Sequence, residues 1–174
     1  MKKIDPKKKI ILDADVIIHF VKGGLIGIMP NIFANKMYVP DVVYRESLSV
    51  KYQTPINNLF NFKLVEELEI KSDLKVFSEY NRLKKRFGKG ESACMAYCRF
   101  NKDVIGSSNL KDITNYCAEH GIVYLTTMDF LVEAFRTKKL SEAECDEFIY
   151  KVKLKNSKLP CNTIFEYIEK FEKE

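Results

Sequence analysis

The chain has 174 residues, of which 46% are hydrophobic and 30% are charged. This is enough apolar material for one packed domain, and it excludes a wholly disordered chain. The net charge of +5 is mildly basic, so an anionic partner is permitted but not required. The longest apolar run, residues 16–29, is interrupted by His19, Lys22 and two glycines, so we expect no membrane-spanning helix. Five cysteines at irregular spacing favour a reducing, cytoplasmic setting over a disulfide framework.

Short apolar segments alternate with helical segments along the chain. Strands are expected over residues 9–13, 37–40, 62–70, 103–106 and 122–125. Helices are expected from about residue 16 to residue 30, over 42–48, from residue 54, and over 74–87, 93–100 and 110–119. From residue 128 onward we expect three further helical pieces, with breaks near 139–140 and 157–160.

This alternation predicts an α/β fold with three layers, α/β/α, around a central parallel sheet. No repeat, low-complexity linker or shift in composition divides the chain, so we expect a single domain over residues 1–174. Its core would span about residues 8–126, and a C-terminal helical extension would follow over about 127–174.

Oxygen-bearing side chains follow several of the predicted strands. They are Asp13, Asp15, Glu46, Glu91, Asn109 and Asp112. Because the carboxyl ends of parallel strands meet at one edge of a sheet, these side chains are expected to converge there. Carboxylates that lie close together repel one another unless a cation lies among them, and oxygen ligands favour a hard ion such as Mg²⁺ or Mn²⁺.

Four segments together resemble the motifs of the PIN-domain nuclease family. They are residues 10–18 (IILDADVII), 38–46 (YVPDVVYRE), 88–93 (GKGESA) and 104–113 (VIGSSNLKDI). Their order, spacing and flanking apolar residues agree with the family over roughly residues 8–126. The third motif and the C-terminal tail look most like a Gly-x-Gly-Glu branch of the family, related to toxin–antitoxin ribonucleases.

The resemblance implies a metal-dependent endoribonuclease that hydrolyses RNA phosphodiester bonds and uses Mg²⁺ or Mn²⁺ as cofactor. The metal ligands and catalytic residues implied are Asp13, Glu46, Glu91 and Asp112. The supporting residues implied are Asp15, Ser108 and Asn109. Many small members of the family are toxins that an antitoxin protein blocks, and many form homodimers, so both partners are implied here.

A basic cluster directly precedes the third motif. Its members are Arg82, Lys84, Lys85, Arg86 and Lys89. Such a cluster beside an acidic site would bind the phosphates of RNA without reading its sequence. A solvated helix face explains the same residues equally well.

Two alternatives to the nuclease remain open. The fourth motif carries Asn109 where the family commonly has an acid, so the scaffold could be a non-catalytic module that binds RNA or protein. Asp13 and Asp15 after an apolar strand also resemble the opening of haloacid-dehalogenase-type phosphatases, in which the first Asp attacks phosphorus. That reading ranks lower, because Val16 and Ser107 stand where that family needs other residues.

Overall fold

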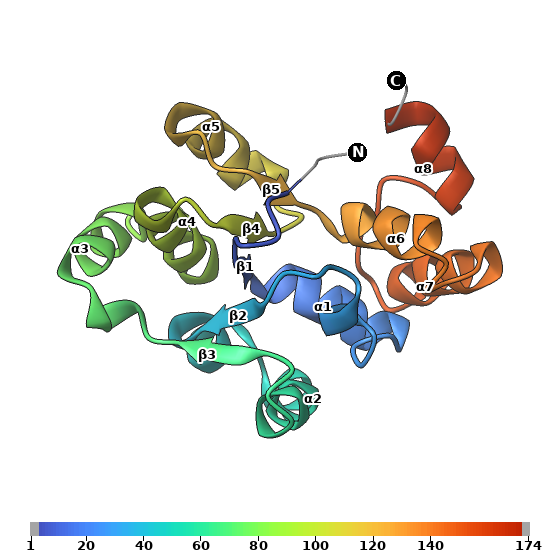
Figure 1. Cartoon of the computed structure of the whole chain (residues 1–174), viewed down its shortest axis with the longest axis horizontal. Helices are drawn as coiled ribbons and strands as arrows, with labels where there is room; N and C mark the ends of the chain where they lie inside the picture. The colour runs from blue at the N-terminus through green and yellow to red at the C-terminus, as the bar shows by residue number, and fades with distance from the viewer. Residues whose placement is uncertain (1–3, 172–174) are drawn as a thin grey trace.

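The computed structural model describes residues 4–171, which form a parallel β-sheet with helices on both faces (Figure 1). The strands are β1 (Ile10–Leu12), β2 (Met37–Pro40), β3 (Glu66–Leu68), β4 (Val104–Gly106) and β5 (Tyr124–Leu125). Within the described residues their spatial order is β3-β2-β1-β4-β5, and every neighbouring pair is parallel. The α/β class with a central parallel sheet is therefore confirmed.

Helices pack on each face of this sheet. They are α1 (Ala14–Gly23), α2 (Val50–Asn61), α3 (Leu74–Leu83), α4 (Lys89–Asn101), α5 (Leu110–His120), α6 (Thr127–Arg136), α7 (Glu142–Leu154) and α8 (Ile164–Phe171). Figure 1 shows α3, α4 and α5 on one side of the sheet and α1, α6 and α7 on the other. Among the helices of residues 4–171, none combines the length and apolar character needed to cross a bilayer.

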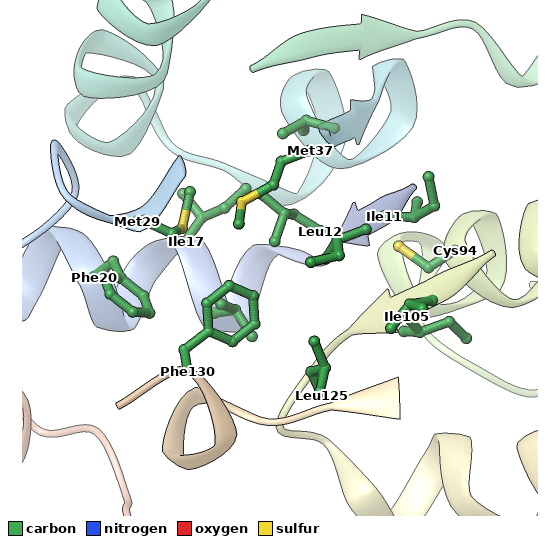
Figure 2. Packing of buried hydrophobic residues seen from close by; sticks show 14 of the residues in the cluster. Ile11, Leu12, Ile17, Phe20, Met29, Met37, Cys94, Ile105, Leu125 and Phe130 are labelled. Carbon is green, nitrogen blue, oxygen red and sulfur yellow. The ribbon is translucent and has the colours of Figure 1, made fainter. Parts of the chain in front are cut away.

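The central strand β1 is buried on both of its faces, as expected for a strand inside a parallel sheet. Its side chains alternate between the two layers. Leu12 points to the side of Phe20 and Phe130, whereas Ile11 lies near Ile105 and Cys94 of the opposite layer (Figure 2). The sequence of β1 is apolar throughout because neither face of this strand meets water.

The C-terminal extension consists of α6, α7 and α8, and its breaks fall where the sequence places them. Reciprocal side-chain caps start α6 at Thr126 and α7 at Ser141. The extension packs on α1 through aromatic contacts, because the ring of Phe20 lies 5.7 Å from that of Phe130 and 5.1 Å from that of Phe148. It is therefore part of one hydrophobic core with the sheet.

Helices α1, α2 and α4 begin earlier than the sequence predicts. Helix α1 starts at Ala14 rather than at about residue 16, and it ends at Gly23 rather than at residue 30 because Gly24 adopts a left-handed conformation. Helix α2 starts at Val50 rather than at residue 54, and Pro55 lies inside it. The hydroxyl of Thr54 donates to the carbonyl of Val50 at 3.1 Å. This hydrogen bond lies next to Pro55, which has no backbone N–H to donate. Helix α4 starts at Lys89 rather than at residue 93, so the whole Gly-Lys-Gly-Glu segment leads directly into its first turn.

The strands β1, β4 and β5 are one or two residues shorter than predicted at an end, and other elements differ more from the prediction. Helix α3 ends at Leu83 instead of residue 87, because the amides of Arg86 and Phe87 both turn back to the Leu83 carbonyl. The strand predicted over 62–70 is reduced to β3, and the chain before it is the end of α2. The helix predicted over 42–48 is a wide π-helical turn, η2 (Val43–Ser47).

Candidate active site

Four carboxylates gather at the carboxyl ends of β1 and β4. Asp13 caps the N-terminus of α1, and Asp15 lies in the first turn of the same helix. Glu91 lies in the first turn of α4 and Asp112 in the first turn of α5. We call these four residues the acidic rim. Three helix N-termini thus point at one region, and their partial positive charge stabilises carboxylates there.

Asp13 is the most enclosed member of the acidic rim, with 2% of its surface exposed. One carboxylate oxygen accepts the amide of Ala14 at 2.7 Å, and the other lies 3.2 Å from the hydroxyl of Ser107. Its own amide donates to the carbonyl of Gly106 at 2.8 Å, which extends the pairing of β1 and β4 past the strand ends. Asp13 is therefore fixed by backbone and side-chain bonds.

Asp15 is held by the loop that follows β4. Its Oδ2 accepts the amide of Ser108 at 2.7 Å and lies 3.4 Å from the hydroxyl of Ser107. Its Oδ1 accepts the amide of Val16 at 2.6 Å. Ser107 therefore lies within reach of both aspartates and joins the two strand ends.

The acidic rim makes ionisation costly for its buried members. Burial raises the pKa of Asp13 well above its ordinary value, and the nearby charges of Asp15 and Glu91 raise it further. Burial also raises the pKa of Asp15 to about 6, although the amides of Ser108 and Val16 oppose this shift. A cation placed among these groups would favour their charged forms.

Asn109 links the two remaining carboxylates of the acidic rim. Its amide nitrogen donates to Oε1 of Glu91 and to Oδ2 of Asp112, each at 2.9 Å. Both Asn109 and Asp112 therefore face the site, which the sequence alone left undecided. The two carboxylates therefore share one hydrogen-bond donor, the side-chain amide of Asn109.

Glu46 lies on the exposed side of this region and forms an ion pair with Lys89. The hydrogen bond from Lys89 holds the pKa of Glu46 below its ordinary value. Within residues 4–171, Glu46 accepts a hydrogen bond from Lys89, and no hydrogen bond joins Glu46 to the acidic rim. Its role as a metal ligand stays a prediction.

Gly90 brings the start of α4 against Asp13. A Cβ atom at this position would lie 2.5 Å from Oδ1 of Asp13 and 3.1 Å from the hydroxyl of Ser47. Any side chain here would displace Asp13, so the second glycine of the Gly-x-Gly-Glu segment is required by close approach.

The basic cluster predicted to bind RNA is partly engaged within the protein. Arg82 forms two hydrogen bonds with Glu79, at 2.6 and 2.8 Å, and Lys89 is paired with Glu46. Lys84 lies over the ring of Tyr80 and Arg86 over the ring of Phe87, while Lys85 is exposed in the turn after α3. Phosphate binding by this cluster stays a prediction.

Several residues of the site were missed by the sequence reasoning. The hydroxyl of Ser108 lies 2.9 Å from that of Thr127, and Thr127 in turn lies 2.8 Å from Nδ1 of the buried His19. Burial lowers the pKa of His19 to about 4, so this imidazole is neutral near pH 7. Ser107 carried a signal, because it directly follows a buried strand. Thr127 could not have been identified from the sequence, because its hydrogen-bond partners are distant along the chain.

The donor atoms of the acidic rim are carboxylate oxygens, which fit a hard divalent cation. Within residues 4–171, no group of three or more histidine, cysteine, aspartate or glutamate side chains is arranged so that it could hold a metal ion. The five cysteines are buried free thiols, and burial raises the pKa of Cys94 and Cys98. The observed arrangement is therefore a parallel α/β protein with carboxylates gathered where its central strands end.

Comparison with known proteins found no matching family model, no matching curated protein and no matching solved structure.

Proposed function

We propose that the chain is a metal-dependent endoribonuclease that hydrolyses RNA phosphodiester bonds at the acidic rim. The observation that carries this proposal is the burial of Asp13 beside Asp15 and Glu91, with a raised pKa and no basic side chain among its hydrogen-bond partners in the described residues. Strongly perturbed carboxylates clustered at the ends of central strands are typical of functional sites. The motif resemblance supports the same function.

Asp13, Glu91 and Asp112 are the residues proposed to hold Mg²⁺ or Mn²⁺, with Glu46 contributing directly or through water. A divalent ion at such a site supplies an activated water and neutralises charge on the phosphate. Ser107 holds Asp13 and Asp15 in place, and the amide of Ser108 fixes Asp15. Asn109 orients Glu91 and Asp112 toward each other.

The choice between RNA and another phosphodiester rests on the motif resemblance alone. The same resemblance supports a toxin role with an antitoxin partner and a homodimeric state. These three points are proposals that depend on the nuclease proposal.

The test is Mn²⁺-dependent cleavage of single-stranded RNA by the wild-type chain and by Asp13→Asn. Asparagine keeps the acceptor for the Ala14 amide and gains a donor toward Ser107, so the variant is expected to fold. We expect cleavage by the wild type and a loss of about a hundredfold or more in the variant.

A thermal shift gives an independent readout of metal binding. At about ten times its Kd, Mn²⁺ stabilises the folded state by about 1.4 kcal/mol, which raises the Tm of a chain of this size by about 4 °C. Asp13→Asn should lose this shift. If the wild type neither cleaves RNA nor responds to Mn²⁺, the scaffold is a binding module without catalysis and the proposal fails.

A further inference from the structure

A cavity of about 420 Å³ lies beside the acidic rim, where α5 and α6 begin and the C-terminal extension covers them. Asn109, Leu110 and Lys111 line it from α5, and Lys158, Tyr167 and Phe171 line it from the extension. We call this cavity the C-terminal pocket. It is distinct from the acidic rim, but Asn109, which lines it, hydrogen-bonds to two carboxylates of the rim.

The C-terminal pocket combines apolar walls with basic side chains. The ring of Phe171 is 51% exposed and Leu110 is 44% exposed, so both present apolar surface to a ligand. Lys111 and Lys158 stand at the pocket and are exposed, and no carboxylate of residues 4–171 lines it. A ligand with a flat apolar part and a negative charge matches this lining.

Asn109 lies between the C-terminal pocket and the carboxylates at which cleavage is proposed. Asn109 lines the pocket, and its side chain donates to Glu91 and Asp112. A group bound in the pocket is therefore one side chain away from the carboxylates. In an RNA strand, a base and the adjacent phosphodiester bond are similarly close together, because a single sugar joins them.

We propose that the C-terminal pocket is a nucleotide-binding subsite, in which a base of the RNA strand stacks on Tyr167 or Phe171 and its phosphates contact Lys111 and Lys158. The subsite holds the nucleotide next to the phosphodiester bond that the acidic rim would cleave, so the inference rests on the proposed function. Base stacking on aromatic rings and lysine contacts to phosphate are the usual means of binding single strands.

The test measures binding in EDTA, so that metal and cleavage play no part. Fluorescence anisotropy of a labelled RNA hexanucleotide gives the Kd for each variant. We expect Tyr167→Leu and Phe171→Ala to weaken binding about tenfold each, through lost stacking. Lys111→Glu and Lys158→Glu are also expected to weaken binding about tenfold each, through lost phosphate contacts.

Matched controls lie on other surfaces of the protein. Tyr150→Ala removes an exposed aromatic ring from α7, and Lys51→Glu reverses an exposed charge on α2. Both should bind RNA like the wild type. Circular dichroism and the Tm of each variant report whether it folds. A second readout that does not depend on any variant is photo-cross-linking of a hexanucleotide with 4-thiouridine, which should attach to Tyr167 or Phe171.

The inference is overturned if folded pocket variants bind the hexanucleotide as tightly as the wild type, if cross-links fall outside the pocket, or if the wild type binds no hexanucleotide at millimolar concentration. Equal binding by pocket variants together with Mn²⁺-dependent cleavage would refute the subsite and leave the proposed function standing. Loss of binding in pocket variants without any cleavage by the wild type would support the subsite and refute the proposed function. A free nucleoside monophosphate that displaces the hexanucleotide at equal concentration would identify a small nucleotide as the ligand and overturn the assignment to an RNA strand.

Discussion

The acidic rim and the surroundings of Glu79 both hold a buried carboxylate, and they compensate its negative charge in opposite ways. Glu79 on α3 is 7% exposed and accepts hydrogen bonds from Arg82, Arg99 and Tyr116 at 2.6 to 2.8 Å. These bonds, above all those from Arg82, lower its pKa to about 2. In the acidic rim, by contrast, burial and neighbouring acids raise the pKa of Asp13 and Asp15.

The difference separates a structural ion-pair network from the site proposed to bind a cation. The Glu79 network satisfies its own charge, so it ties α3 to α4 and α5 and needs no ligand. The acidic rim keeps its carboxylates by means of amides and hydroxyls alone, which leaves their negative charge available to a cation. Burial alone therefore does not distinguish the two regions, whereas the presence or absence of a cationic hydrogen-bond partner does.

The largest expected effect is on catalysis. Glu91→Gln should lower Mn²⁺-dependent RNA cleavage about a hundredfold, because it removes a charged oxygen from the acidic rim. Glu79→Gln, assayed at a temperature where it is folded, should cleave within about twofold of the wild type. Single-turnover cleavage rates decide between the two. Equal losses in both variants would erase the distinction between the regions.

The next effect is on stability. Glu79→Gln should lower the free energy of unfolding by about 2 kcal/mol, because it takes a charge-assisted acceptor from Arg82, Arg99 and Tyr116. Urea denaturation followed by circular dichroism measures this. The exposed Glu69 offers a matched control, and Glu69→Gln should stay within about 0.5 kcal/mol of the wild type. A Glu79 variant as stable as this control would mean that the network contributes nothing.

A smaller change of opposite sign is expected in the acidic rim. Asp13→Asn should raise the free energy of unfolding by about 1 kcal/mol while it removes cleavage, because it relieves a buried negative charge among like charges. The same urea titration, in EDTA, measures it. A loss of stability larger than that of Glu79→Gln would show that the Asp13 charge is compensated in the folded protein after all.

The smallest effect is in the pH dependence. Glu79 has a folded-state pKa of about 2 against 4.5 in the unfolded chain, so its stabilising effect is complete above pH 4.5 and is lost as the pH falls toward 2. The stability gap between the wild type and Glu79→Gln should therefore shrink by about 1 kcal/mol between pH 4.5 and about pH 3.5. Asp15 acts with the opposite sign, since its pKa of about 6 lies above 3.8 and its protonation favours the folded state. Denaturation at a series of pH values measures both trends, and a constant gap would contradict the first.

Local sequence signals were sufficient for the sheet and for most of the acidic rim. The strand over 37–40 was predicted with its final bounds, because an apolar run closes at Pro40 where a helical turn begins. Asp13, Glu91 and Asp112 could be found because each follows a strand end or opens a helix. The early start of α2 could not, since Pro55 reads as a first-turn residue and only the packed structure places it inside the helix.

Long-range contacts were beyond reach of the sequence. Arg82 of the basic cluster binds Glu79, and Glu79 also binds Arg99 of α4 and Tyr116 of α5, which are 20 and 37 residues away along the chain. The C-terminal pocket unites residues 108–111 with residues 158–171, a pairing that no local pattern contains. Helical periodicity predicted the helices of the extension but not the position of their exposed rings.

The hydrogen bonds of Ser108 bear on where the chain can be truncated. Ser108 accepts the amide of Thr127 at 2.9 Å and gives its own amide to Asp15, so the first residue of α6 is two hydrogen bonds from the acidic rim. A truncation after residue 126 would remove that support and uncover Phe20, on which Phe130 and Phe148 pack. The C-terminal extension therefore supports the position of the acidic rim as well as the hydrophobic core.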